Sequence, residues 1–315
     1  MLCVFTVFVT GCGSNEALIN EYDAYTYNNS YTNTDAVTVN ADYFSKDLCV
    51  TNAINFGTQD TYSEVAKGAG VFNVDSGEVL YNQDIFEQLY PASTTKILTA
   101  YIILKDCSLS DVVTISESAA DQASDSSTVG LNAGDNITVN DLLYGLMLHS
   151  GNDAAEALAE YHSGSIEEFG KVMTEEAHKL GATNSQFKNP SGLPDKEHYT
   201  TVYDMYLIFN EAIKNEKFVE IISCGTKNAV YTSANGETIE KTYYNHSRYH
   251  TGSVETPNGF EIIGGKTGTT YDAGYCLVLF SKNPAGQGII SIVFKADGPH
   301  NLYLLMNQIL SKFAN

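Results

Sequence analysis

The amino-acid sequence predicts an α+β fold in which an antiparallel sheet is flanked by helices and carries an inserted all-helical subdomain. Short β-rich runs occur at two distant places, residues 68–83 and residues 226–296. Between them, from about residue 110 to 220, apolar residues recur at helical spacing. The early and late strands must therefore share a sheet, with the helical residues inserted between them.

The N-terminus predicts an export signal. Residues 2–10 form an apolar run that is too short to span a bilayer as a helix of about 20 residues and resembles the core of a signal peptide. The run ends in Val-Thr-Gly-Cys at residues 9–12, which resembles a bacterial lipobox. We therefore expect a signal peptide over residues 1–12 and a lipid on Cys12. A frayed apolar terminus is the alternative, and the missing Lys or Arg before the run leaves the true start open.

A polar segment follows. Residues 13–62 are rich in Asn, Thr, Tyr and Asp and show no apolar period of 2 or 3.6. We expect a flexible linker whose r.m.s. reach is roughly 40 Å, or a disordered spacer of no tuned length. The folded domain is expected over residues 63–315.

The composition argues against nucleic-acid binding and against a metal site. The net charge is −21, from 38 acidic and 17 basic residues, so the chain repels nucleic acid at long range. The cysteines that would remain in the domain favour buried free thiols over a disulfide framework, and none shows CxxC or Cys/His spacing. We expect no metal and no cofactor.

The elements follow in order. Residues 68–83 predict a hairpin around Asp75-Ser76-Gly77, and a helix start follows near residue 93. Two helices are expected on either side of a break at residues 150–151. Another helix over residues 165–182 has Gly181 as its C-terminal stop.

Five short β-rich runs then predict neighbouring strands of an antiparallel sheet; they span residues 226–234, 237–244, 260–268, 273–282 and 288–296. The final helix is expected to start at an Asn301 cap and to pack its apolar face on the sheet.

Ser93 and Lys96 are the first candidates for chemistry. Their i, i+3 spacing places the two side chains on one face of a helix. Serine is a poor nucleophile without a base, and lysine becomes a base only if burial or a second cation lowers its pKa. By itself, this pair is a weak signal.

Two further motifs strengthen it. Ser150-Gly151-Asn152 stands at the break between two helices, and Lys266-Thr267-Gly268 ends an apolar strand. The three motifs, in this order, are the signature of penicillin-binding proteins and class A β-lactamases.

With these motifs, the chain resembles the serine-type D-alanyl-D-alanine carboxypeptidases, the low-molecular-mass penicillin-binding proteins. The resemblance covers about residues 65–313 and includes the stretches PASTTKILTA, DLLYGLMLHSGNDAAEALAE, FKNPSGLPDKEHYTT and GGKTGTTYDAGYCLV. It implies a β-lactamase/transpeptidase-like fold. Because the sequence stops after its last predicted helix, we expect neither the extra β-rich domain nor the C-terminal membrane helix of many relatives.

The resemblance also implies roles. Ser93 would attack the D-Ala-D-Ala peptide bond, Lys96 would take its proton, and Ser150 would relay a proton to the leaving nitrogen. Asn152 and Thr267 would bind the substrate, and Lys266 would attract its terminal carboxylate. The backbone N–H groups of Ser93 and Thr269, which follows Gly268, would hold the oxyanion.

The implied partners are peptidoglycan stem peptides ending in D-Ala-D-Ala, β-lactam antibiotics as covalent inhibitors, and the membrane through the N-terminal lipid. The implied location is the cell envelope, outside the cytoplasm. Two alternatives stay open. One is a class A-like β-lactamase, against which stand Gly151 in the second motif and the absence of Glu from residues 181–192. The other is a non-catalytic penicillin-binding or wall-binding lipoprotein.

Overall fold

The computed structural model describes residues 48–315. The predicted signal peptide, its Cys12 and most of the predicted linker lie outside the described residues. Within the described part of the chain, no helix is both long enough and apolar enough to cross a membrane.

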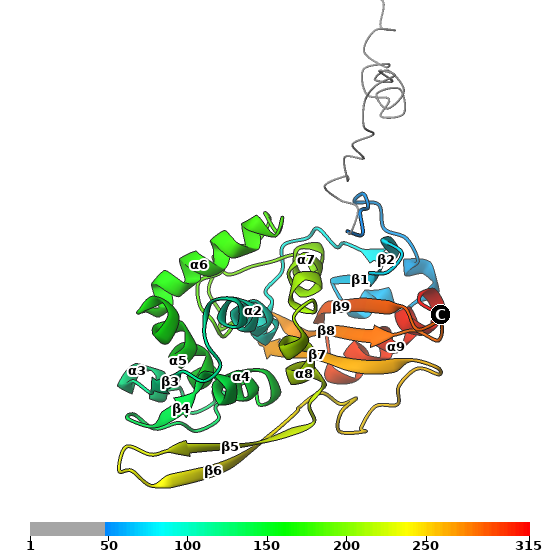
Figure 1. Cartoon of the computed structure of the whole chain (residues 1–315). Helices are drawn as coiled ribbons and strands as arrows, with labels where there is room; N and C mark the ends of the chain where they lie inside the picture. The colour runs from blue at the N-terminus through cyan, green and yellow to red at the C-terminus, as the bar shows by residue number, and fades with distance from the viewer. Residues whose placement is uncertain (1–47) are drawn as a thin grey trace, which may run out of the picture. The chain divides into compact units, whose positions relative to one another are not determined.

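A five-stranded antiparallel sheet joins the two ends of the domain, in the order β2-β1-β9-β8-β7 (Figure 1). The strands are β1 Gly68–Asn73, β2 Glu78–Gln83, β7 Glu261–Thr270, β8 Gly274–Lys282 and β9 Gly288–Ala296. Early and late strands therefore share one sheet, as predicted. Every residue of the central strand β9 except Lys295 is buried, which explains its nearly continuous apolar run.

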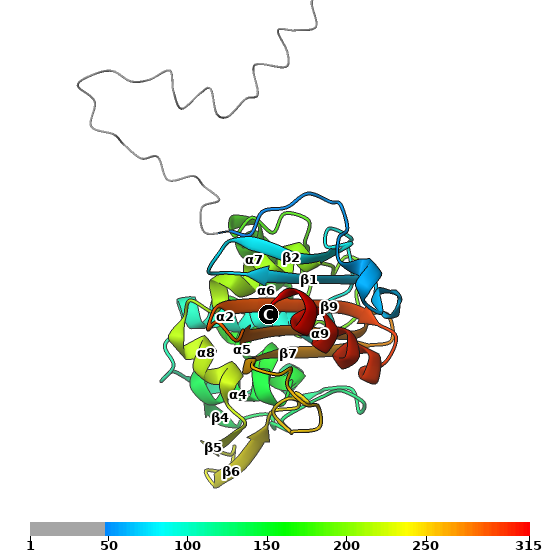
Figure 2. The ribbon, with the colours of Figure 1, turned by 90° about the vertical axis from the view of Figure 1, so that its right-hand side faces the viewer.

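Helices cover both faces of this sheet, as predicted. Helix α9 (Pro299–Phe313) packs on one face, as Figure 2 shows, and α7 (Val202–Ala212) and α8 (Glu216–Ser223) pack on the other. The predicted Asn301 cap is wrong, because the helix starts at Pro299 after Gly298, where proline's fixed φ suits a first helical residue. The Asn301 side chain instead donates to Asp297 Oδ1 at 2.7 Å.

The inserted block is mostly helical. Its elements are α2 Lys96–Asp106, β3 Val112–Thr114, α3 Glu117–Ala120, β4 Asn136–Thr138, α4 Val139–Leu148, α5 Asn152–Ser163 and α6 Ile166–Lys179. As predicted, α4 and α5 flank a break, and the chain turns after α6 at Gly181, whose φ is 88°.

A second sheet corrects one prediction. The strands β5 (Thr226–Thr232) and β6 (Thr238–Tyr244) form a hairpin that joins β3 and β4 in a four-stranded sheet. The sequence predicts β5 and β6 as neighbours of β7 to β9, but the structure places them in this other sheet. Alternation along a strand indicates which of its faces is buried, but it does not specify the partner strand.

Residues 48–62 pack on the domain, although the sequence assigns them to the linker. Cys49 is fully buried, and its N–H donates to the Tyr206 hydroxyl at 2.8 Å. Phe56 forms a β-bridge to Asn82, and two 3₁₀ turns follow at Thr58–Asp60 and Ser63–Val65. The folded unit therefore starts before residue 63. The cysteines in the described residues, Cys49, Cys107, Cys224 and Cys276, are unpaired, as predicted. Cys49 and Cys276 are also buried, whereas Cys107 and Cys224 are only partly buried, contrary to the prediction.

We expect Tyr206→Phe to lower the free energy of unfolding by about 1–3 kcal/mol, because it leaves the buried N–H of Cys49 without a partner. Tyr203→Phe is the matched control, since its hydroxyl donates to the carbonyl of the same Cys49 at a site that is only partly buried. Urea unfolding of both variants measures the difference. Equal losses would show that burial of this N–H does not matter.

Candidate active site

Ser93 lies on a 3₁₀ turn, η3 (Ala92–Thr95), and Lys96 starts the α-helix that follows. The turn packs against β7 at Gly268, where an added Cβ would stand 2.8 Å from the backbone nitrogen of Ser93. Only glycine permits this approach without a shift of the backbone. The first and third sequence motifs therefore meet at this point.

Three groups surround the amine of Lys96. Its Nζ lies 3.1 Å from Ser93 Oγ, 2.7 Å from Asn152 Oδ1 and 2.8 Å from the carbonyl oxygen of Ser191. The two carbonyl-type oxygens can only accept, so they take two N–H bonds. In the neutral amine, the remaining position is a lone pair that faces the Ser93 hydroxyl and can accept its proton.

Burial makes the neutral form of Lys96 accessible. The side chain is fully buried, and burial is the main reason why the pKa of Lys96 lies well below its usual 10.5. Repulsion from the ammonium group of Lys266 lowers this pKa further. Burial and a second cation, Lys266, therefore both lower the pKa of Lys96.

Lys266 is itself only 3% exposed, and its amine donates to the carbonyl of Thr267 at 2.9 Å. Burial lowers the pKa of Lys266 to about 7. An anion bound beside this amine would favour its charged form again. The protonated, positively charged fraction of Lys266 therefore increases when an anionic ligand binds.

The second motif is joined to the site through Asn152. Its Oδ1 accepts from Lys96, and its Nδ2 donates to Ser126 Oγ at 2.6 Å. Ser150 has a left-handed backbone with φ of 62°. Within the described residues, its hydroxyl makes no hydrogen bond to Ser93 or Lys96.

A cavity of about 390 Å³ opens over this network. Predicted site residues in its lining are Ser93, Asn152 and Thr269. The other five lie outside the lining: Lys96, Ser150, Lys266, Thr267 and Gly268. The cavity gives a ligand direct access to the Ser93 hydroxyl.

Sequence reasoning missed the loop that carries Ser191. Asn189 Oδ1 accepts from the N–H groups of Ser191, Gly192 and Leu193, and this turn holds the Ser191 carbonyl toward Lys96. Gly192 has φ of 84°, and an added Cβ would stand 1.8 Å from the Ala92 carbonyl oxygen. The Asn-Pro-Ser-Gly run at residues 189–192 is the turn signal that could have revealed it.

Two buried polar residues support the site without facing the cavity. His198 Nδ1 accepts from the N–H of Lys188 at 3.2 Å, so its Nε2 carries the proton and donates to Thr95 Oγ1 at 2.9 Å. Asp153 accepts from the N–H groups of residues 129, 130 and 131. Its carboxylate thus fixes the segment next to Ser126.

His149, which precedes Ser150, is not placed to act as a base for Ser93. Its ring packs against His246, with centroids 4.7 Å apart, and no hydrogen bond to Ser93 is present within residues 48–315. The neighbouring histidine is therefore no substitute for Lys96 as the base.

Known proteins are similar to this chain in sequence. The family model of D-alanyl-D-alanine carboxypeptidases matches residues 56–298. The D-alanyl-D-alanine carboxypeptidase DacF of Bacillus subtilis is 37% identical over 241 residues, which are 74% of this chain and 58% of that relative. The chain thus spans little more than half of that protein. A D-alanyl-D-alanine carboxypeptidase of a Streptomyces species is 33% identical, with 72% of this chain and 80% of that relative covered.

The fold is shared with solved structures as well. A crystal structure of a Streptomyces DD-transpeptidase aligns with a TM-score of 0.71 at 29% identity, covering 78% of this chain and 97% of that one.

We expect Asp153→Asn to destabilise the segment at residues 129–131, because an amide accepts fewer and weaker bonds than a carboxylate. The free energy of unfolding should fall by about 2 kcal/mol. Asp121→Asn, at an exposed position, is the control for the lost charge. Thermal unfolding of both variants measures the effect, and an unchanged Asp153→Asn transition would contradict the assigned support.

Proposed function

Because the chain belongs to the family of D-alanyl-D-alanine carboxypeptidases, we propose that it removes the terminal D-alanine from peptidoglycan stem peptides through an acyl-enzyme on Ser93. The observation that carries this proposal is the contact between Ser93 Oγ and the fully buried Lys96 Nζ at 3.1 Å. A hydroxyl beside an amine of lowered pKa is a nucleophile beside its base.

In the acylation step, Ser93 Oγ attacks the carbonyl carbon of the D-Ala-D-Ala bond while its proton passes to Lys96. The N–H groups of Ser93 and Thr269 hold the resulting oxyanion. The C–N bond then breaks, and Ser150 relays a proton from Lys96 to the leaving D-alanine nitrogen. The left-handed backbone of Ser150 between α4 and α5 is compatible with this role, because strained conformations gather at functional sites.

Lys266, Thr267 and Asn152 position the substrate. Lys266 attracts the terminal carboxylate, and the hydroxyl of Thr267 binds it. Asn152 holds the substrate amide while its Oδ1 keeps the amine of Lys96 in place. Gly268 has no side chain that could separate this strand from Ser93.

In the second step, water attacks the acyl carbonyl and Lys96 takes the proton of the water. As the bond to Ser93 Oγ breaks, Lys96 returns this proton to Ser93 Oγ, and the free enzyme is restored. Apart from the attacking water and the substrate, the groups used in this cycle are side chains and backbone N–H groups of the chain. β-Lactams mimic the D-Ala-D-Ala end and would acylate the same hydroxyl.

The substrate places the reaction in the cell envelope, outside the cytoplasm. We further propose that a lipid on Cys12 anchors the protein at the outer face of the membrane and that the polar segment after it serves as a tether. The motif at residues 9–12 supports this anchor, which lies outside the described residues. Metabolic labelling with a fatty acid, compared between the full chain and Cys12→Ala, tests it.

We expect Ser93→Ala to lower D-alanine release from a D-Ala-D-Ala peptide by more than about 10³-fold, since the nucleophile is lost. Labelled penicillin should attach to Ser93 in the unaltered protein and stay attached, whereas Ser93→Ala should remain unlabelled. Ser124→Ala, an exposed serine close to the cavity, should behave like the unaltered protein. Rapid turnover of penicillin would favour the β-lactamase alternative, and labelling without D-alanine release would favour a binding protein.

We expect kcat/KM for this peptide to fall as pH rises through about 7, the pKa of Lys266, because the free enzyme then loses the charge that receives the carboxylate. Arginine stays protonated at these pH values, so Lys266→Arg should move this fall upward by at least about 2 pH units. On kcat, the fall should lie at higher pH than on kcat/KM, because the bound carboxylate stabilises the charged amine.

Lys282→Arg, at an exposed position, is the control. An unchanged profile in Lys266→Arg would show that another group controls the fall.

A further inference from the structure

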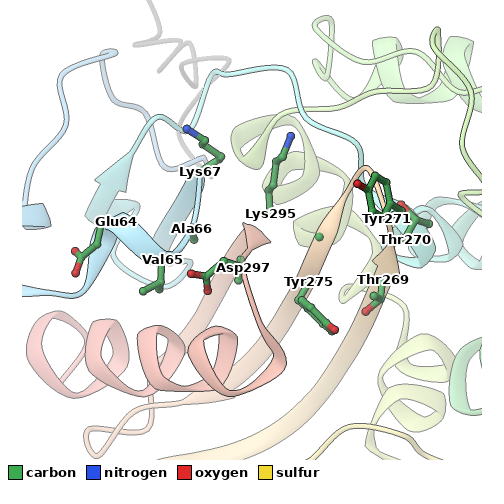
Figure 3. A pocket seen from close by; sticks show the side chains of 12 residues that line it. Glu64, Val65, Ala66, Lys67, Thr269, Thr270, Tyr271, Tyr275, Lys295 and Asp297 are labelled. Atoms are coloured by element: carbon green, nitrogen blue, oxygen red, sulfur yellow. The ribbon is translucent and has the colours of Figure 1, made fainter.

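A second cavity, of about 580 Å³, lies beside the catalytic one at the end of the five-stranded sheet (Figure 3). It lies between the residues before β1, the turn from β7 to β8 and the end of β9. The residues that line both cavities are Thr269, Thr270 and Tyr271. Tyr271 is fully exposed, so an aromatic ring stands free at the junction of the two cavities.

Two lysines give this cavity a positive side. Lys67 and Lys295 are both exposed, and neither forms an ion pair with any carboxylate of residues 48–315. Figure 3 shows their side chains extending to the same side of the cavity, away from Glu64 and Asp297. In a chain of net charge −21, two neighbouring lysines without a carboxylate partner favour an anionic ligand.

The backbone of Lys295 adds an independent observation. Its φ is 54°, a left-handed conformation that glycine adopts freely and that is costly for other residues. The pairing of β8 with β9 is also irregular between Tyr275 and Leu277, and such bulges redirect side chains near active sites. A charged side chain is therefore held where glycine would fit with less strain.

The direction of the substrate follows from the proposed function, on which this inference rests. The terminal carboxylate lies at Lys266 and Thr267, and the reacting carbonyl lies at the N–H of Thr269. The peptide before the scissile bond therefore continues past Thr269 toward Tyr271 and into the second cavity.

The dimensions agree with this path. Thr269 pairs with Tyr275, and Tyr275 pairs with Ala296, so the end of β9 lies two strand spacings, roughly 10 Å, from Thr269. Each residue of an extended peptide covers about 3.3–3.6 Å. A side chain borne two or three residues before the scissile bond can therefore reach the lysines.

We propose that this cavity is a subsite for the acyl side of the substrate, in which Lys67 and Lys295 bind a side-chain carboxylate two or three residues before the scissile bond. Tyr271 covers the peptide between the two cavities. The preferred substrates are thus D-Ala-D-Ala peptides that carry an acidic residue upstream.

Two peptides of equal length test the subsite. Both end in D-Ala-D-Ala, and one carries a carboxylate at the upstream position where the other carries its amide. The unaltered protein should show a higher kcat/KM for the carboxylate peptide by about fivefold or more, a modest ratio because these charges are exposed and screened by salt. Lys295→Gly and Lys67→Gln should each remove most of this preference, chiefly through KM, and Lys295→Arg should keep it.

The controls separate the subsite from folding and from net charge. Lys295→Gly relieves the left-handed backbone, so its Tm should not fall. Lys282→Gln removes one exposed positive charge at the far end of β8 and should leave the preference unchanged. If it lowers the preference as much as Lys295→Gly does, the effect is one of net charge and the subsite is overturned.

Binding gives a readout that does not depend on turnover. The same two peptides are titrated into Ser93→Ala by calorimetry, with and without Lys295→Gly. A Kd ratio near one in Ser93→Ala overturns the subsite, even if the active enzyme releases D-alanine. A Kd ratio of about fivefold that Lys295→Gly abolishes supports the subsite, while absence of D-alanine release from both peptides would overturn only the proposed function.

Discussion

The burial of one amine is the constraint on which the rest of the site depends. Lys96 is fully buried, and an isolated cation is costly inside a protein. Burial therefore lowers the pKa of Lys96, and the amine needs hydrogen-bond partners. The Asn152 side chain and the Ser191 carbonyl take two of its bonds, which leaves the third direction for Ser93. The hydrogen bonds of this one amine thereby connect three segments that are far apart in the sequence.

The electrostatics of the molecule oppose its proposed ligand at long range and favour it locally. The chain carries a net charge of −21, yet Lys96 and Lys266 lie buried near each other. In the neighbouring cavity, Lys67 and Lys295 form no ion pair with residues 48–315. Buried charges are screened less than exposed ones. A substrate carboxylate would therefore respond most strongly to the buried amine of Lys266 and more weakly to the exposed Lys67 and Lys295.

Backbone strain is concentrated at the same place. Three of the four non-glycine residues with positive φ among residues 48–315 are Ala92 before the nucleophile, Ser150 in the second motif and Lys295 at the second cavity; the fourth, Asp84, follows β2. Such conformations persist only where the surrounding structure enforces them. Close packing of η3 against β7 and against the loop around Gly192 provides that enforcement at Ala92.

The sequence by itself determined the α+β class, the shared sheet of early and late strands, and the motif residues Ser93, Lys96 and Lys266, because periodicity and short motifs are local properties. The last helix starts at Pro299 and not at the predicted Asn301 cap, because proline is favourable as a first helical residue. Only the tertiary structure decided that β5 and β6 join β3 and β4, that residues 48–62 pack on the domain, and that the Ser191 carbonyl holds Lys96. These features depend on which distant surfaces meet, and hydrophobic pattern does not specify a partner.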